Sequence, residues 1–139
     1  MTQLAAMDPR EANVNDAQLE PTPELLAELA QKNEELESAT PSEIIRWAIE
    51  HFGDKLTMAT AFGPEGCSII HMIAQIDPNM HVFNLDTGYQ FQETLDLRDR
   101  IAEKYGVHVE MKQPELTVEQ YEQKHGGPLY KTNPDQCCF

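Results

Sequence analysis

Short apolar segments alternate with longer amphipathic segments through the middle of the chain. Residues 56–60, 81–85 and 107–111 are short, apolar and compatible with strands buried in a parallel sheet. Apolar residues recur at helical spacing between them, over residues 67–76 and 91–105. Strands that alternate with helices of this length predict right-handed βαβ units, so we expect an α/β fold with a parallel sheet and flanking helices.

Capping signals predict further helices on both sides of this segment. Thr22-Pro23 predicts a helix that ends near Glu37, and Thr40-Pro41-Ser42-Glu43 is a capping box for a second helix that ends at Gly53. Another threonine cap predicts a helix over 117–125, whereas residues 126–139 show no period. The residues expected to face inward are Ile44, Ile45, Trp47, Ala48 and Ile49 in the second helix, and Leu95, Leu97, Ile101 and Ala102 in helix 91–105.

Residues 1–21 are polar and acidic without a period, and we expect a disordered acidic tail there. The globular part is then expected over residues 22–139.

A loop rich in glycine follows the first predicted strand. Residues 61–66 contain two glycines and a proline and lead into the helix expected from Cys67. Unpaired N–H groups and the positive end of the helix dipole make such a loop a natural site for phosphate or sulfate. The alternative is a plain strand–helix connection that happens to contain glycine.

A second special turn, Asp86-Thr87-Gly88, follows the second predicted strand. In parallel sheets, ligands bind beyond the carboxyl ends of the strands, where both loops belong. We therefore expect the two loops to border one pocket. The other interpretation of residues 86–94 is an ordinary strand end, turn and helix start.

Composition narrows the classes of function. The net charge of −14 disfavours binding to nucleic acid, and no apolar run approaches the roughly 20 residues of a membrane span. No lysine-bearing phosphate loop, dinucleotide fingerprint or His-Glu-x-x-His motif occurs. Three cysteines without an export signal make a disulfide scaffold improbable, so we expect a cytoplasmic protein that uses thiols for chemistry or metal binding.

Two of these cysteines, Cys137 and Cys138, are adjacent. Neighbouring cysteines rarely form an unstrained disulfide, which leaves exposed thiols or two ligands of an iron–sulfur cluster. A four-iron cluster usually takes four cysteines, and only Cys67 remains, so this chain alone does not complete such a site.

Three motifs together resemble the assimilatory adenylylsulfate (APS) reductases of the PP-loop, or adenine nucleotide α-hydrolase, superfamily. They are Ala61-Phe-Gly-Pro-Glu-Gly66, Leu85-Asp-Thr-Gly-Tyr-Gln-Phe-Gln-Glu-Thr94 and Asp135-Gln-Cys-Cys138, and the resemblance runs from about residue 40 to the end. It implies a parallel-sheet α/β fold and thioredoxin-dependent reduction of adenylylsulfate to sulfite and AMP.

The resemblance also implies site residues. The family's phosphate loop holds the phosphosulfate group, which falls here on Thr60, Phe62, Gly63, Glu65 and Gly66. Its Leu-Asp-Thr-Gly turn borders the adenosine, which falls on Leu85, Asp86, Thr87 and Gly88. Its cysteine pair supplies two ligands of a 4Fe-4S cluster, here Cys137 and Cys138.

The family pattern continues past the cysteine pair with a Cys-x-x-Cys and a nucleophilic cysteine, neither of which is in this sequence. We therefore expect the N-terminal part of such a reductase, incomplete at its C-terminus, with no catalytic residue of its own and a packing role for Cys67. A homo-oligomer is possible for such a protein. The alternatives are a phosphoadenylylsulfate (PAPS) reductase, which lacks the cluster, and a non-catalytic nucleotide-binding fragment. An ATP-using PP-loop enzyme would instead need a Ser-Gly-Gly-x-Asp-Ser type of loop.

Overall fold

The computed structural model describes residues 19–138, with only the backbone described for Cys138. The chain divides into two compact units, with the boundary between Ile44 and Ile45. Most of the predicted acidic tail lies outside the described residues. No helix in the described part of the chain is long and apolar enough to cross a membrane.

The first helices begin where their caps predict. Helix α1 (Pro23–Leu36) starts after Thr22, whose Oγ1 accepts from the Leu25 N–H over 3.2 Å. Helix α2 (Pro41–Phe52) has the predicted capping box, because the Thr40 N–H donates to the Glu43 carboxylate over 2.7 Å and the Glu43 N–H donates to Thr40 Oγ1 over 3.3 Å. A single 3-10 turn, η1 (Gly53–Lys55), follows α2.

The prediction that one face of α2 is buried is wrong, because none of its residues is fully buried. Ile44 is 40% exposed, and Ile45, Trp47, Ala48 and Ile49 are only half-buried. An amphipathic pattern shows which side chains favour burial, but burial also needs a surface that covers them.

Three parallel strands form the centre of the second unit. They are β1 (Met58–Ala59), β2 (Val82–Leu85) and β3 (Val109–Lys112), in the spatial order β1-β2-β3. The predicted parallel sheet is therefore confirmed, although β1 is shorter than the segment 56–60.

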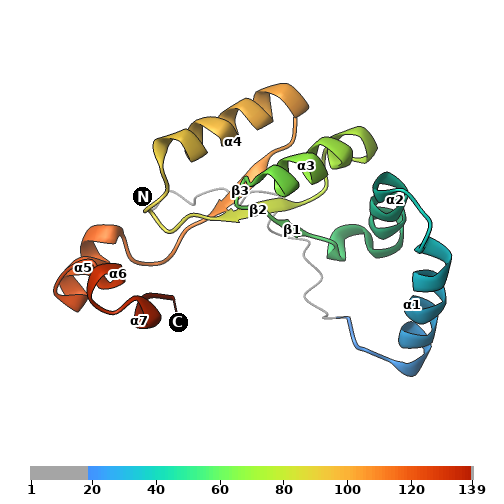
Figure 1. Cartoon of the computed structure of the whole chain (residues 1–139), viewed down its shortest axis with the longest axis horizontal. Coiled ribbons are helices and arrows are strands. Elements are labelled where there is room, and N and C mark those ends of the chain that lie inside the picture. Colours follow the sequence, from blue (N-terminus) through green and yellow to red (C-terminus); the bar gives the residue numbers. More distant parts are fainter. Residues whose placement is uncertain (1–18, 139) are drawn as a thin grey trace, which may run out of the picture. The chain divides into compact units, whose positions relative to one another are not determined.

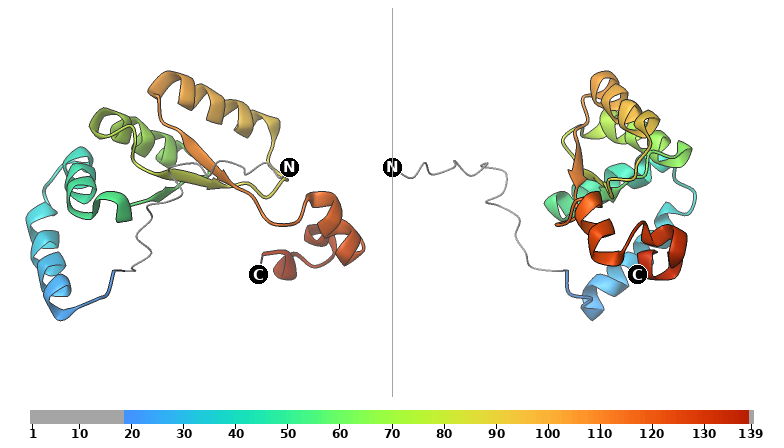
Figure 2. Two further views of the ribbon diagram at one scale, coloured as in Figure 1. Left: turned by 180° about the vertical axis from the view of Figure 1, so that it is seen from behind. Right: turned by 90° about the vertical axis from the view of Figure 1, so that its left-hand side faces the viewer.

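The two crossover helices cover one face of this sheet. Helices α3 (Pro64–Ile76) and α4 (Gln92–Tyr105) lie on the same side of the strands, as Figures 1 and 2 show from several directions. The core between them and the strands contains Phe62, Ile70, Val82, Ile101, Val107 and Val109. Ala102 was expected to point inward but is exposed, because it lies at the margin of the apolar stripe of α4.

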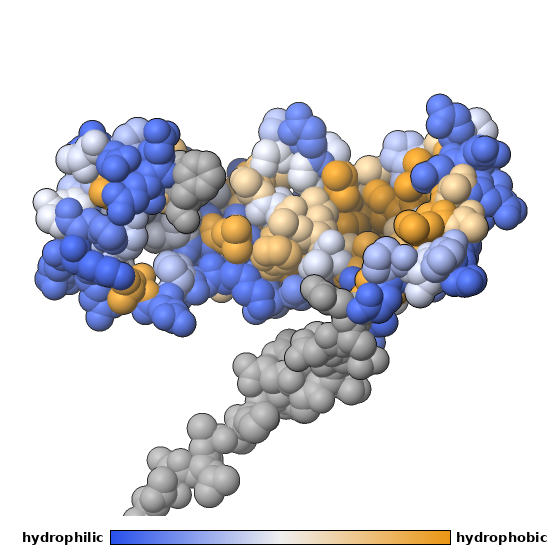
Figure 3. All heavy atoms as spheres, turned by 90° about the horizontal axis from the view of Figure 1, so that it is seen from below, coloured by the Kyte–Doolittle hydropathy of each residue, from blue (hydrophilic) through white to orange (hydrophobic). Residues whose placement is uncertain are grey.

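Within residues 45–138, no helix covers the opposite, open face of the sheet. Ala59, Phe83 and Glu110 are register partners on this face, and Leu85, one pleat further along β2, is 64% exposed. Figure 3 looks at the molecule from below and shows apolar side chains gathered among polar ones.

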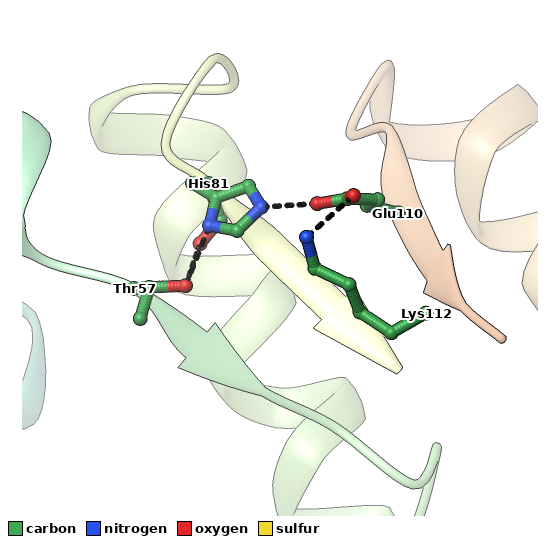
Figure 4. A network of polar contacts seen from close by, with 4 residues as sticks. All are labelled: Thr57, His81, Glu110 and Lys112. Atoms are coloured by element: carbon green, nitrogen blue, oxygen red, sulfur yellow. Dashed lines mark hydrogen bonds and ion pairs between the residues drawn. The ribbon is translucent and has the colours of Figure 1, made fainter. Parts of the chain in front are cut away.

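A polar network crosses the three strands on the open face (Figure 4). Thr57 Oγ1 lies 2.7 Å from His81 Nδ1, and His81 Nε2 lies 2.7 Å from Glu110 Oε2. Lys112 Nζ contacts the other Glu110 oxygen over 2.7 Å. These contacts tie the strands together at the surface.

Three helices follow β3. Helix α5 (Val118–His125) has the predicted Thr117–Gln120 capping box, with 3.2 Å between the Gln120 N–H and Thr117 Oγ1. Helices α6 (Leu129–Thr132) and α7 (Pro134–Cys138) were missed by the sequence prediction. They are too short to show a hydrophobic period.

Candidate functional site

The glycine-containing loop is shorter than predicted, because α3 begins at Pro64 and not at Cys67. Gly63 is the N-cap, proline occupies the first helical position, and no side chain caps this end of the helix. The first turn of a 13-residue helix therefore directs backbone N–H groups and the positive dipole end toward the loop.

Phe62 turns the chain at the start of the loop with a left-handed backbone conformation. Its φ of 59° lies in the left-handed region, and its ring is 6% exposed in the core. Its N–H donates to Thr60 Oγ1 over 3.0 Å. Burial of the ring holds the strained turn in place, so Phe62 can face a ligand only through its backbone.

The two glycines of the loop have different local environments. A Cβ on Gly66 would lie 2.7 Å from Thr60 Oγ1, so glycine is required for α3 to approach the end of β1. A Cβ on Gly63 would meet nothing closer than Glu65 Oε2 at 3.5 Å. Glu65 itself is exposed in the first turn of α3, where its charge favours the dipole.

Residues 86–88 shape the second turn. Asp86 Oδ1 accepts from the Gly88 N–H over 2.9 Å, and Asp86 Oδ2 accepts from Gln113 over 3.3 Å. Thr87 Oγ1 accepts from the Tyr89 N–H over 3.4 Å. Gly88 has φ 78°, and a Cβ on it would lie 2.6 Å from Val118 Cγ2. The turn is thus closed by its own side chains and packed against α5.

One pocket of about 540 Å³ lies at the carboxyl ends of β1 and β2. This volume is in the range of small-molecule sites. Ala61 of the first loop lines the pocket, but residues 86–88 do not, so the expectation that both loops border one pocket is met only for the first loop. Of the predicted site residues, only Thr60 and Leu85 line it. The other lining residues are Ala59, Ala61, Asn84, Tyr89, Gln90, Phe91 and Thr94.

A chain of hydrogen bonds connects the walls of this pocket. Asn84 Nδ2 donates to the Thr60 carbonyl over 2.7 Å, and Gln90 Nε2 donates to Asn84 Oδ1 over 2.5 Å and to the Leu85 carbonyl over 3.1 Å. Thr60 is 7% exposed and Asn84 3% exposed, so these bonds are screened little by water. The sequence interpretation missed Asn84 and Gln90. The available signal was a lone asparagine within an apolar strand.

Among the described residues, no lysine, arginine or histidine lines this pocket. The groups that this part of the chain offers to an anion are the backbone N–H groups and the dipole at the start of α3. Desolvation and the hydrogen bond to Glu122 raise the pKa of Tyr89, which also lines the pocket, to about 12.

The cysteines occupy two separate places. Cys67 packs against the core and its Sγ donates to the Phe62 carbonyl over 3.5 Å, which confirms its expected packing role. Cys137 is a partly exposed free thiol in α7, next to Cys138. Among residues 19–137, no group of three or more His, Cys, Asp or Glu side chains is arranged to hold a metal. The adjacent pair supplies half of the four thiolates that a four-iron cluster takes.

Comparisons with known proteins find relatives over most of the chain. A family model described as "Phosphoadenosine phosphosulfate reductase domain" matches residues 55–139. Adenosine 5'-phosphosulfate reductase of Bacillus pumilus is 43% identical over 96 residues, which are 68% of this chain and 41% of that protein. The Staphylococcus haemolyticus protein of the same name is 42% identical over 98 residues, which are 70% of this chain and 40% of that protein. The chain thus spans about two fifths of the length of the curated relatives it matches.

A solved structure shares the fold. The crystal structure of phosphoadenylyl-sulfate (PAPS) reductase from Candida auris, in a phosphate complex, aligns with a TM-score of 0.72 and 29% identity over 86% of this chain and 58% of that one. The family resemblance and the α/β fold predicted from the sequence are both confirmed. Because the family model covers more than half of its residues, the chain belongs to the phosphoadenosine phosphosulfate reductase domain family.

Proposed function

We propose that this chain is the nucleotide-binding portion of an adenylylsulfate reductase. The whole protein would reduce adenylylsulfate to sulfite and AMP with electrons from thioredoxin. The observation that carries the proposal is the pocket at the ends of β1 and β2, lined by Thr60 and Ala61 before α3 and by Asn84 and Leu85 of β2. The names of the relatives that are about 40% identical support the choice of substrate.

The residues of the first loop would hold the phosphosulfate end. Gly63 leaves space at the N-terminus of α3, while Thr60 and Gly66 set the approach of that helix to β1. Phe62 would shape the loop through its left-handed backbone, since its N–H already donates to Thr60 Oγ1. The Glu65 carboxylate, whose Oε2 lies 3.5 Å from a Cβ built on Gly63, would have to turn toward solvent when the anion binds. Backbone N–H groups are suited to this task because they hold an anion without a cationic side chain.

The second turn would border the adenosine. Leu85 lines the pocket with apolar surface, which suits the face of a purine. Asp86, Thr87 and Gly88 would set the backbone of this wall through the hydrogen bonds of the turn.

The reaction of the whole protein would begin with a cysteine thiolate outside this chain. The thiolate attacks the sulfur of adenylylsulfate, an S–S bond forms, and the S–O bond to the phosphate breaks to release AMP. One thioredoxin thiol then attacks the enzyme sulfur and displaces sulfite, and its second thiol resolves the mixed disulfide to leave reduced enzyme and oxidised thioredoxin. Such chemistry fits a reducing compartment, the cytoplasm.

We further propose that Cys137 and Cys138 are two ligands of a 4Fe-4S cluster, with the remaining ligands outside this chain. Bound there, the cluster would supply a charged, redox-capable centre. Iron and acid-labile sulfide should be present in anaerobically purified full-length protein and be lost in Cys137→Ser and Cys138→Ser. Cys67→Ser is the matched control and should retain both, because Cys67 packs against the core.

Reduction of phosphoadenylylsulfate is the second candidate, because the Candida auris neighbour is a PAPS reductase. A 3'-phosphate adds negative charge that normally needs a cationic partner. In the part of the chain that the structure describes, no lysine or arginine lines the pocket, and the relatives that are about 40% identical are named for adenylylsulfate; both support adenylylsulfate as the first candidate.

Calorimetry with AMP, adenylylsulfate and phosphoadenylylsulfate tests the proposal on the full-length protein. We expect AMP and adenylylsulfate to bind, and phosphoadenylylsulfate to bind at least about tenfold more weakly, a difference of about 1.4 kcal/mol. Tighter binding of phosphoadenylylsulfate would favour the second candidate. No binding of any of the three would reject both.

A further inference from the structure

Tyr89 belongs both to the pocket and to the helices that follow β3. Its side chain lines the pocket, and its hydroxyl donates to the Glu122 carboxylate of α5 over 2.9 Å. Its ring meets the Tyr130 ring of α6 edge-on, with centroids 5.4 Å apart and planes at 75°. A single side chain thus touches the candidate nucleotide site and two C-terminal helices.

The backbone next to Tyr89 is packed against the same helices. Gly88 lies so close to Val118 of α5 that an added Cβ would sit 2.6 Å from Val118 Cγ2. The contact between the turn and α5 therefore does not depend on one flexible side chain. A displacement of the turn has to displace α5 or break this contact.

Further contacts connect Tyr130, which touches Tyr89, to Cys137. Helices α6 and α7 pack against each other, and Asn133 lies between them. Its N–H donates to the Leu129 carbonyl over 2.7 Å, and its carbonyl accepts from the Cys137 N–H over 3.2 Å. Leu129 is buried, which anchors α6.

We propose that Tyr89 is a positioning residue that couples occupancy of the pocket to the placement of Cys137. A nucleotide that packs against Tyr89 would restrict the ring, and the contacts to Glu122 and Tyr130 would pass that restriction to α5, α6 and α7. The identity of the ligand as a nucleotide rests on the proposed function, whereas the anchoring of the helices by Tyr89 does not.

The first arm of the test needs no ligand. Iodoacetamide alkylation of Cys137 is followed by mass spectrometry in this 139-residue chain, purified without iron so that no cluster holds the thiol, together with hydrogen exchange of residues 118–138. Loss of a hydrogen bond to a charged acceptor should raise the alkylation rate at least about threefold in Tyr89→Phe and Glu122→Ala. Glu122→Gln keeps an acceptor and should restore the wild-type rate.

Tyr105→Phe is the matched control, because Tyr105 packs against His71 at the far end of α4 and should leave Cys137 unchanged. Equal rates in wild type and Tyr89→Phe would overturn the positioning role. So would a Glu122→Gln protein that behaves like Glu122→Ala.

The second arm adds saturating AMP, with its affinity measured by calorimetry on each variant. In wild type, AMP should slow alkylation of Cys137 at least about threefold. In Tyr89→Phe, which keeps the ring in the pocket, AMP should still bind but no longer change the rate. Bound AMP without any change in the wild-type rate would overturn the coupling, as would an undiminished AMP effect in Tyr89→Phe. Absence of AMP binding in wild type would overturn the proposed function and the nucleotide part of the coupling, while the ligand-free arm would still decide the positioning role.

Discussion

The side-chain amide of Asn84 donates to the backbone carbonyl of Thr60 over 2.7 Å and thereby joins the carboxyl end of β2 to that of β1. Both residues are almost fully buried. Asn84 also accepts from Gln90, which in turn donates to the Leu85 carbonyl. The two walls of the pocket therefore share one hydrogen-bonded frame.

Asn84→Leu should break this frame. It removes the side-chain donor to the Thr60 carbonyl and leaves the Gln90 amide with only the Leu85 carbonyl as acceptor. A buried polar group that loses its partner costs about 1–3 kcal/mol. The free energy of unfolding, measured by urea denaturation, should fall by that amount. Gln92→Ala is the control, since its bond to Asp96 is exposed on α4 and its loss should cost less than about 0.5 kcal/mol. A fall no larger than that of the control would show that the bond contributes nothing.

Gly63→Ala and Gly66→Ala should separate binding from packing in the first loop. Gly63→Ala should fold normally, since the added Cβ has room and Gly63 has φ −67°. If the anion occupies the N-terminus of α3, the added Cβ should keep it from the backbone and weaken AMP or adenylylsulfate binding at least about tenfold. Gly66→Ala should lower stability by about 1–3 kcal/mol, because its Cβ would overlap Thr60 Oγ1. Calorimetry and urea denaturation measure the two effects. Unchanged affinity in Gly63→Ala would mean that the loop is a plain connection.

Gly88→Ala and Gly106→Ala form a matched pair for the second turn. Both glycines have positive φ, 78° and 66°, so alanine costs about 1–2 kcal/mol of backbone strain at each position. Only Gly88 has a close neighbour, so Gly88→Ala should cost about 1–3 kcal/mol more. Equal losses of stability in urea denaturation would contradict the close packing of the turn against α5.

The network on the open face of the sheet should make stability depend on pH. Hydrogen bonds from Lys112 and from His81 lower the pKa of Glu110 below its ordinary 4.5. A carboxyl group with a lowered pKa in the folded state stabilises the fold above its unfolded pKa, and this contribution is lost as the pH falls through the folded pKa. The stability difference between wild type and Glu110→Gln should therefore be present at neutral pH and shrink as the pH falls below about 4.5.

Thermal melts between pH 3 and pH 7 measure this difference. Because Glu110 is 42% exposed, we expect the effect to be small and to weaken further in high salt. Glu103→Gln, on the exposed surface of α4, is the control. A difference between wild type and Glu110→Gln that stays constant across this range would refute the role of the network.

Most of the elements follow from local sequence. The capping boxes at Thr40 and Thr117 locate the starts of two helices, because their hydrogen bonds join residues three apart. The alternation of strands and helices determined the parallel sheet, since a parallel pair needs a crossover connection. The same reasoning located both loops at one edge of the sheet, but the pocket at that edge is lined by Ala61 of the first loop and not by residues 86–88.

The detailed shape of the pocket was decided only by the tertiary structure. Asn84 and Thr60 are 24 residues apart in the chain, and Gly88 and Val118 are 30 apart, so no local pattern shows that they touch. Helix α3 starts at Pro64, directly after a turn in which Phe62 has a left-handed backbone and a buried side chain. Burial of Phe62 depends on the packed core, which the local sequence does not show. Local propensity specifies which elements form, whereas contacts between distant residues specify which side chains meet, because such contacts exist only after the chain has packed.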